Sequence, residues 1–240
     1  MENKHLDSHY FKLSTLSPVH IGSGRKYMYG LDYIYSSKKL FFLNNDSIWK
    51  AFPNKLVEIS KHLADGNISE VINLYKNLGV FRDNRFIIFQ TEFPFKSNEV
   101  FQAISDGFNR PIIPGSSIKG SLRSIILNRM YQENPGREMN ERNLVGGIDD
   151  SLFKYIQVSD TTWKKRKVMP VKVFSGDLGN DRNPDMGQWK DAFRGGHNPM
   201  FREEDFTSGY EVIPDESYSY CRINWPSQSK AVNIRNFDRN

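Results

Sequence analysis

A turn followed by a helical pattern near the middle of the chain contains the residue types that bind phosphate groups. Gly115, Ser116 and Ser117 precede this pattern, so their backbone N–H groups are expected to lie at the N-terminus of a helix. That end of a helix carries partial positive charge, and Lys119 and Arg123 follow one helical turn apart. The segment predicts a phosphate site, although a serine-capped helix with solvated basic side chains explains it equally well. The spacing from Gly115 to Lys119 is too short for a nucleotide-hydrolysing P-loop.

A glycine-rich stretch near the N-terminus is the second candidate site. Gly22 and Gly24 would let the backbone approach a ligand, and Arg25 could meet a phosphate. His20 could act as a general base towards a ribose 2′-hydroxyl, since an imidazole titrates near neutral pH. We favour a histidine that hydrogen-bonds a loop or stacks on a base, because no acid partner for cleavage stands nearby.

A basic turn with a neighbouring tryptophan is the third candidate site. Lys164, Lys165 and Arg166 supply positive charge and Trp163 a stacking surface, as in RNA-binding loops, although the solvated tip of a hairpin is commoner. The histidines show no helical metal-binding pair, and the single cysteine, Cys221, cannot complete a zinc set. We therefore expect neither a metal nor another cofactor.

Composition limits the class of protein. The chain has 240 residues, of which 38% are hydrophobic and 25% charged, so it is long enough to bury a core. Its 33 basic and 28 acidic residues leave a net charge of +5, which favours anionic partners only moderately. The short apolar runs exclude a membrane-spanning helix, the single cysteine excludes an intrachain disulfide framework, and the N-terminus lacks the apolar stretch of a signal peptide. We expect a soluble, cytoplasmic protein.

Strands and helices must position these candidate residues. Alternating or β-rich patterns predict strands at residues 10–16, with one face buried, and at 31–35, 40–43 and 86–91. The second and third of these strands are expected to form a hairpin, and residues 17–30 a glycine-rich loop. Residues 46–79 predict two helices, the first capped by Asp46 or Ser47 and the second by Asn67 and Gly79. An amphipathic helix is expected at 118–130.

The second half of the chain predicts an α+β protein with late strands. Residues 153–159 and 168–174 read as a hairpin around the basic turn, and 210–213 and 218–223 as two further strands. We expect one domain over residues 1–175 with a helical insertion at 46–79. Residues 176–209 predict a long loop, ordered on contact or partly disordered. Residues 210–240 predict a hairpin and tail that pack on the same sheet or are the remnant of a second half-domain.

Four segments resemble the RAMP superfamily of CRISPR proteins, and within it the family of the fifth Csm subunit of type III-A complexes. They are residues 18–24 (PVHIGSG) with 31–34 (LDYI), 113–123 (IPGSSIKGSLR), 155–160 (YIQVSD) and 210–214 (YEVIP). The resemblance covers roughly residues 10–173 and 210–224. Members of that family are usually longer, with a second sheet-bearing half, so a truncated, split or compact member is expected.

The resemblance implies an RNA-recognition-motif-like, ferredoxin-type antiparallel sheet with helices on one face. It implies a noncatalytic subunit that binds the 3′ part of the CRISPR guide RNA, helps its maturation, meets target RNA indirectly and caps the filament of backbone subunits. The aromatic-rich run 210–225 would then be a sheet edge covered by the terminal backbone subunit. The positions carried over from the family are His20, Gly22, Gly24, Ser116, Ser117, Lys119 and Arg123.

Two alternatives stay open. The superfamily also contains RNA-cleaving members, so a metal-independent endoribonuclease with His20 as general base is the runner-up. A protein scaffold without significant RNA affinity is the third possibility.

Overall fold

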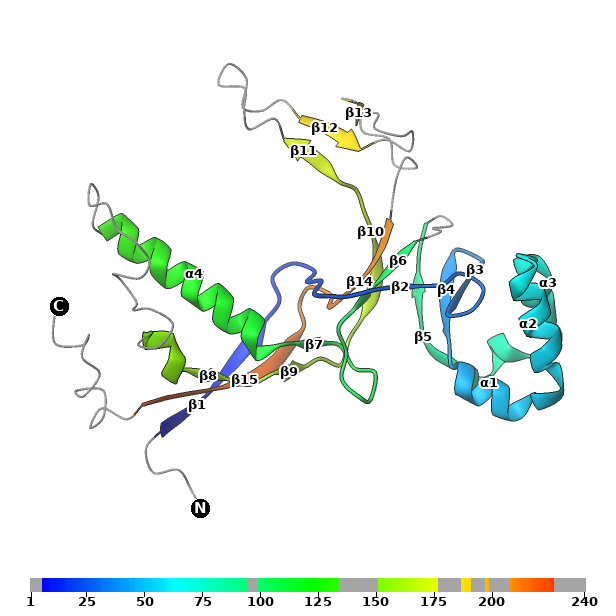
Figure 1. The fold of residues 1–240 in the computed structure, drawn as a ribbon, viewed down its shortest axis with the longest axis horizontal. Coiled ribbons are helices and arrows are strands. Elements are labelled where there is room, and N and C mark those ends of the chain that lie inside the picture. Colours follow the sequence, from blue (N-terminus) through cyan, green and yellow to red (C-terminus); the bar gives the residue numbers. More distant parts are fainter. Residues whose placement is uncertain are drawn as a thin grey trace. The chain divides into compact units, whose positions relative to one another are not determined.

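The computed structural model describes residues 6–94, 99–133, 151–176, 187–190, 197–198 and 208–226. The chain forms two compact units, each built from segments far apart in the sequence (Figure 1). The first unit comprises Met1–Val19, Ile104–Lys165 and Ile213–Asn240, and the second comprises His20–Ala103 and Arg166–Val212. Each unit therefore combines separate parts of the chain. The domains predicted from the sequence, residues 1–175, 176–209 and 210–240, follow chain order instead, and that division stays a prediction.

The first unit contains a three-stranded antiparallel sheet with a late strand at its centre. β1 (Leu6–Ser14) pairs along its whole length with β15 (Tyr218–Pro226), which also pairs with β8 (Gln157–Val158). The prediction that β15 forms a hairpin with the preceding strand, at an uncovered edge, is therefore wrong. The predicted buried face of the first strand is buried only in part, since Thr15 is 6% exposed and Leu13 is half-buried, but Phe11 is 44% exposed.

A long helix begins beside the same sheet. β7 (Ile112–Ile113) lies just before α4 (Gly115–Glu133) in the sequence and pairs with β9 (Thr161–Thr162). Between the helix and β9, η4 (Leu152–Tyr155) leads into β8. Gly115 is required at the start of α4, because a β-carbon there would overlap the carbonyl oxygen of Val158. The predicted helix is confirmed, although its apolar side is not uniformly buried, since Ile125 is 65% exposed.

The second unit contains a four-stranded sheet in the order β10-β14-β6-β2. Its strands are β2 (Gly22–Tyr27), β6 (Val100–Ala103), β10 (Lys167–Val171) and β14 (Ser208–Val212). β14 and β6 are parallel, and the other neighbours are antiparallel. Residues that were predicted to form a glycine-rich loop thus form strand β2, in which Gly24 adopts a φ of 79° at an irregularity of the pairing.

The predicted hairpin is confirmed in the same unit, whereas the first of the two helices predicted over residues 46–79 is divided into two at Pro53. β3 (Tyr33–Ser36) and β4 (Lys39–Leu43) are joined by Ser37 and Lys38, whose φ angles of 53° and 59° suit the turn that matches strand twist. β5 (Ile87–Glu92) completes this sheet. The helical elements are α1 (Asn45–Ala51), η1 (Pro53–Lys55), α2 (Leu56–Ala64), α3 (Ile68–Asn77), η2 (Val80–Arg82) and η3 (Asn84–Phe86).

Apolar burial holds this helical part together. Its core consists of Ile34, Leu43, Ile48, Ile59, Val71, Tyr75, Val80 and Phe86. Asn67 lies at the N-cap position of α3 as predicted, but its side chain makes no capping hydrogen bond; Gly79 follows the end of the helix with a φ of 72°. The N-cap of α1 was predicted wrongly. Oδ1 of Asn44, and not a side chain of Asp46 or Ser47, accepts the capping hydrogen bond, which the backbone N–H of Ser47 donates.

A further prediction in the second half of the chain is wrong. Residues 153–159 and 168–174 do not form a hairpin, because β8 pairs with β15 and β10 pairs with β14. Within the predicted loop 176–209, β11 (Phe174–Gly176), β12 (Gly187–Lys190) and β13 (His197–Asn198) form a small antiparallel sheet. Ser208 and Gly209 belong to β14, and residues 177–186, 191–196 and 199–207 lie outside the described residues. The fold is of the α+β class, and no helix in the described ranges has the length and apolar character needed to cross a membrane.

Candidate nucleic-acid interface

The N-terminus of α4 is occupied by a carboxylate of the protein itself. The Gly115 N–H donates a hydrogen bond of 2.7 Å to Oδ1 of Asp160. The N–H groups of Ser117 and Ile118 donate to the carbonyl oxygen of Pro114, at 2.9 and 3.2 Å. An acid at this position stabilises the helix dipole and repels a phosphate. The backbone part of the predicted phosphate site is therefore already filled, and no pattern in the sequence indicated that Asp160 would bond to Gly115.

The side chains predicted on α4 keep part of their exposure. Ser116 is exposed, and Ser117, Lys119 and Arg123 are half-buried. The guanidinium carbon of Arg123 lies 5.4 Å from the centre of the Phe153 ring, so it rests on an aromatic surface as well. Lys119 and Arg123 are one turn apart on the same helix, as predicted.

His20 is held by the backbone of the four-stranded sheet. Its Nδ1 lies 2.7 Å from the carbonyl oxygen of Glu211. Because a carbonyl only accepts, Nδ1 carries the proton in this hydrogen bond. The ring also meets Tyr210 edge-on, with 5.0 Å between ring centres, and a β-carbon on Gly22 would lie 3.2 Å from Nε2. The ring is thus hydrogen-bonded to the backbone of strand β14 and not to a loop, and a role of His20 towards RNA stays a prediction.

A buried charge network is built around Glu211, the residue whose backbone carbonyl accepts the hydrogen bond from His20. Glu211 is 2% exposed, and its carboxylate accepts hydrogen bonds from the Tyr27 hydroxyl at 2.9 Å and the Ala103 N–H at 3.0 Å. Nη1 of Arg166 lies 3.3 Å from the same carboxylate, and its guanidinium covers the Phe89 ring at 4.1 Å. Burial, then the charge of Glu211, raises the pKa of Tyr27 far above its ordinary value.

This network changes the interpretation of Arg166. Its side chain is only 13% exposed and neutralises a buried acid, whereas it was predicted to bind RNA. The neighbouring Lys164 and Lys165 are exposed in the first unit. Trp163, which was expected to offer a stacking surface, is 1% exposed, and its Nε1–H donates to Oγ1 of Thr161. The basic turn therefore keeps two solvent-facing cations.

The predicted residues fall into two groups, one in each unit. The first unit holds Ser116, Ser117, Lys119, Arg123, Lys164 and Lys165, and the second holds His20, Gly22, Gly24, Arg25 and Arg166. In the second group Gly24 and Arg25 are exposed. Around Gly24 a β-carbon would meet no atom within 4 Å among the described residues, so this bend of β2 is open to a ligand.

Sequence reasoning missed the aromatic side of a pocket in the first unit. This pocket of about 440 Å³ is lined by Lys164 and Lys165 and by Tyr218 and Tyr220 of β15. The available signal was the alternation of large polar aromatic residues along the last strand. In the described part of the chain, no group of three His, Cys, Asp or Glu residues is placed to hold a metal ion.

Comparison with known proteins identifies the family. The sequence model of the RAMP superfamily matches residues 12–232. The chain is similar to the CRISPR system Cms protein Csm5 of Streptococcus thermophilus, with 33% identity over 196 residues, which are 65% of this chain and 52% of that protein. It also resembles a chain in a cryo-EM structure of a Csm-crRNA-target RNA ternary complex of a type III-A CRISPR-Cas system. That match has a TM-score of 0.64 and 15% identity, and covers 95% of this chain and 66% of the other. This chain thus spans about half the length of Csm5, and by its match over residues 12–232 it belongs to the RAMP superfamily.

Proposed function

We propose that this protein is a noncatalytic, guide-RNA-binding subunit of a type III-A CRISPR effector complex. The observation that carries the proposal is the 33% identity with Csm5, at a length of alignment that includes most of the chain. The neighbouring solved structure, a Csm complex with crRNA and target RNA, supports the same assignment at the level of fold. The subunit would act in the cytoplasm, without a cofactor.

Its detailed role in such a complex is part of the same proposal. The chain would contact the 3′ part of the guide RNA, help its maturation and cap the filament of backbone subunits. An RNA-recognition-motif-like, ferredoxin-type arrangement is the finer fold assignment that goes with this role. Sequence information would be left to base pairing, and the protein would hold RNA by its phosphates, with target RNA an indirect partner.

The side chains of the candidate interface support binding more than cleavage. His20 donates through Nδ1 to a backbone carbonyl, and its ring packs on Tyr210, which is how a structural histidine is held. Lys119 on α4 is partly exposed, so it is the cation of the predicted motif that we assign to a phosphate.

Co-expression of the full chain with the other Csm subunits and guide RNA, followed by tagged purification, tests the proposal. A stoichiometric complex that survives RNase treatment is the expected result and supports protein-held capping. A complex lost only on RNase treatment supports recruitment through RNA. Failure to co-purify under both conditions refutes membership of the complex.

Salt-dependent RNA binding tests the phosphate contact. Lys119→Ala should weaken binding of single-stranded RNA regardless of its sequence and reduce the slope of log affinity against log salt by about 0.7. Lys61→Ala, which removes an exposed lysine on α2 of the other unit, is the matched control and should leave the slope unchanged. Equal slopes in both variants would remove Lys119 from the interface.

A further inference from the structure

One face of the β1–β15 pair collects tyrosines and cations. In the pairing register, Tyr10 lies opposite Arg222, and Lys12 lies opposite Tyr220, with Tyr218 two residues before Tyr220 on β15. Residues opposite each other in an antiparallel pair share a face, and so do alternate residues of one strand. These five residues, Tyr10, Lys12, Tyr218, Tyr220 and Arg222, therefore lie on one face of the sheet, which we call the tyrosine face.

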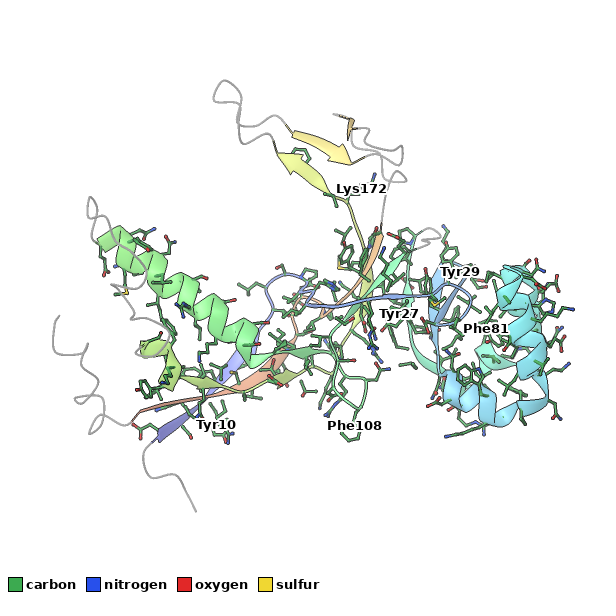
Figure 2. All side chains as sticks on the ribbon, in the orientation of Figure 1. Tyr10, Tyr27, Tyr29, Phe81, Phe108 and Lys172 are labelled. Carbon is green, nitrogen blue, oxygen red and sulfur yellow. The ribbon has the colours of Figure 1, made fainter. Side chains whose placement is uncertain are left out.

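This face is exposed, whereas the opposite face is partly buried along β15. Tyr10 is 73% exposed, and Tyr218 and Tyr220 are each 61% exposed; Tyr10 is labelled on β1 in Figure 2. On the opposite face, Cys221 is 2% exposed, and Ile223 is half-buried. A two-sided strand pair with one packed face is ordinary, but three large rings on the solvent side mark a binding surface.

The rings and charges on this face are in contact with one another. Nζ of Lys12 lies 4.7 Å from the centre of the Tyr218 ring, and the Tyr218 and Tyr220 rings are 6.2 Å apart at 83°. The pocket of about 440 Å³ begins beside these two tyrosines and extends the surface to the exposed Lys164 and Lys165. Glu216 is the acid that lines this pocket, so cations outnumber acids over the whole surface.

The chemistry of the tyrosine face selects its occupant. This face alternates exposed tyrosine rings with cations, which suits a partner that carries both negative charge and flat rings for stacking. Bases of a single strand stack on exposed aromatic rings, and its phosphates meet neighbouring basic side chains. A duplex keeps its bases stacked internally and would leave the rings unused.

We propose that the tyrosine face of β1 and β15 binds single-stranded RNA. Bases stack on Tyr220 and Tyr10, since Lys12 already lies over the Tyr218 ring. Lys12 and Arg222 meet the phosphates, and Lys164 and Lys165 continue the path of the strand through the pocket. This inference rests on the proposed function as an RNA-binding subunit, and it assigns a surface that differs from the α4 motif.

Fluorescence anisotropy with a labelled oligouridine and the full chain, at several salt concentrations, tests the assignment. Tyr220→Ala and Tyr10→Ala should each weaken binding at least about fivefold without changing the salt slope, because they remove a stacking partner and no charge. Tyr220→Phe keeps the ring and should bind like the unmodified chain. Lys12→Ala and Arg222→Ala should each reduce the salt slope by about 0.7.

Phe108→Ala is the matched control, because Phe108 is an 84% exposed ring in the same unit but outside this face (Figure 2). Its affinity should equal that of the unmodified chain. Circular dichroism of each variant shows that the fold is intact, which is expected because the substituted tyrosines are exposed.

Two of the remaining outcomes separate this inference from the proposed function. Unchanged affinity in both tyrosine-to-alanine variants overturns the tyrosine face, while co-purification with the Csm subunits still decides the proposed function. Tyrosine variants that keep RNA affinity but lose the protein complex after RNase treatment make this face a protein interface and also overturn the inference. An unmodified chain with no RNA affinity overturns RNA binding altogether.

Discussion

Removal of Arg166 is the sharpest test of the buried network in the second unit. Arg166 is 13% exposed, and its Nη1 lies 3.3 Å from the carboxylate of Glu211, which is 2% exposed. Arg166→Ala leaves that acid buried with the two neutral donors, the Tyr27 hydroxyl and the Ala103 N–H. Breaking a buried pair by removing one partner typically costs about 3–5 kcal/mol. The lost contact with the Phe89 ring acts in the same direction.

Hydrogen exchange gives a local measure of this loss. The Ala103 amide donates to Glu211, so its exchange reports opening of this part of the sheet. A loss of about 3 kcal/mol should speed its exchange roughly 100-fold. Arg25→Ala, an exposed arginine in the same unit, is the control and should change stability by less than about 0.5 kcal/mol.

The comparison with RNA binding decides between two roles for Arg166. If Arg166→Ala leaves exchange at Ala103 unchanged and lowers RNA affinity with a reduced salt slope, the side chain is a phosphate ligand and the network reasoning fails. If exchange accelerates and the double variant Arg166→Ala/Glu211→Gln recovers part of the stability, the pairing is structural. Recovery is expected because the second substitution removes the uncompensated charge.

Three further predictions concern single positions. Gly115→Ala should destabilise the protein by about 1–3 kcal/mol in urea unfolding, since the added methyl group overlaps the Val158 carbonyl. Gly120→Ala is the control on the same helix and should stabilise the protein, because its methyl group enters open space. Equal effects of the two substitutions would refute the close contact. Burial raises the pKa of Tyr75 to about 12, so its stabilising contribution is present below pH 10 and is lost as the pH rises towards 12; Tyr75→Phe should flatten alkaline unfolding curves between those values, and an unchanged curve would contradict it. The pure chain should not cleave labelled repeat RNA with Mg²⁺ or with EDTA, and cleavage that His20→Ala abolishes would establish the endoribonuclease instead.

Short-range patterns determined several elements without help from the rest of the fold. The hairpin of β3 and β4 follows from two β-rich runs and a polar two-residue turn, and both turn residues adopt the positive φ that such a connection needs. α3 follows from an apolar stripe between Asn67 and Gly79. In these cases the hydrogen bonds and caps join residues close in sequence, so the residue types carry the information. The RAMP motifs could be recognised in the sequence for the same reason.

Tertiary structure decided which distant segments meet. Periodicity indicates that residues 218–223 form a strand, but it does not say that β1, at the other end of the chain, is its partner. For the same reason, the sequence did not predict the hydrogen bond between Asp160 and Gly115 or the buried ion pair of Arg166 and Glu211. A charged side chain looks solvated in sequence until its partner is known. The tyrosine face likewise exists only because strand pairing places Tyr10 beside Tyr220, since face and exposure are properties of the assembled sheet and not of either strand.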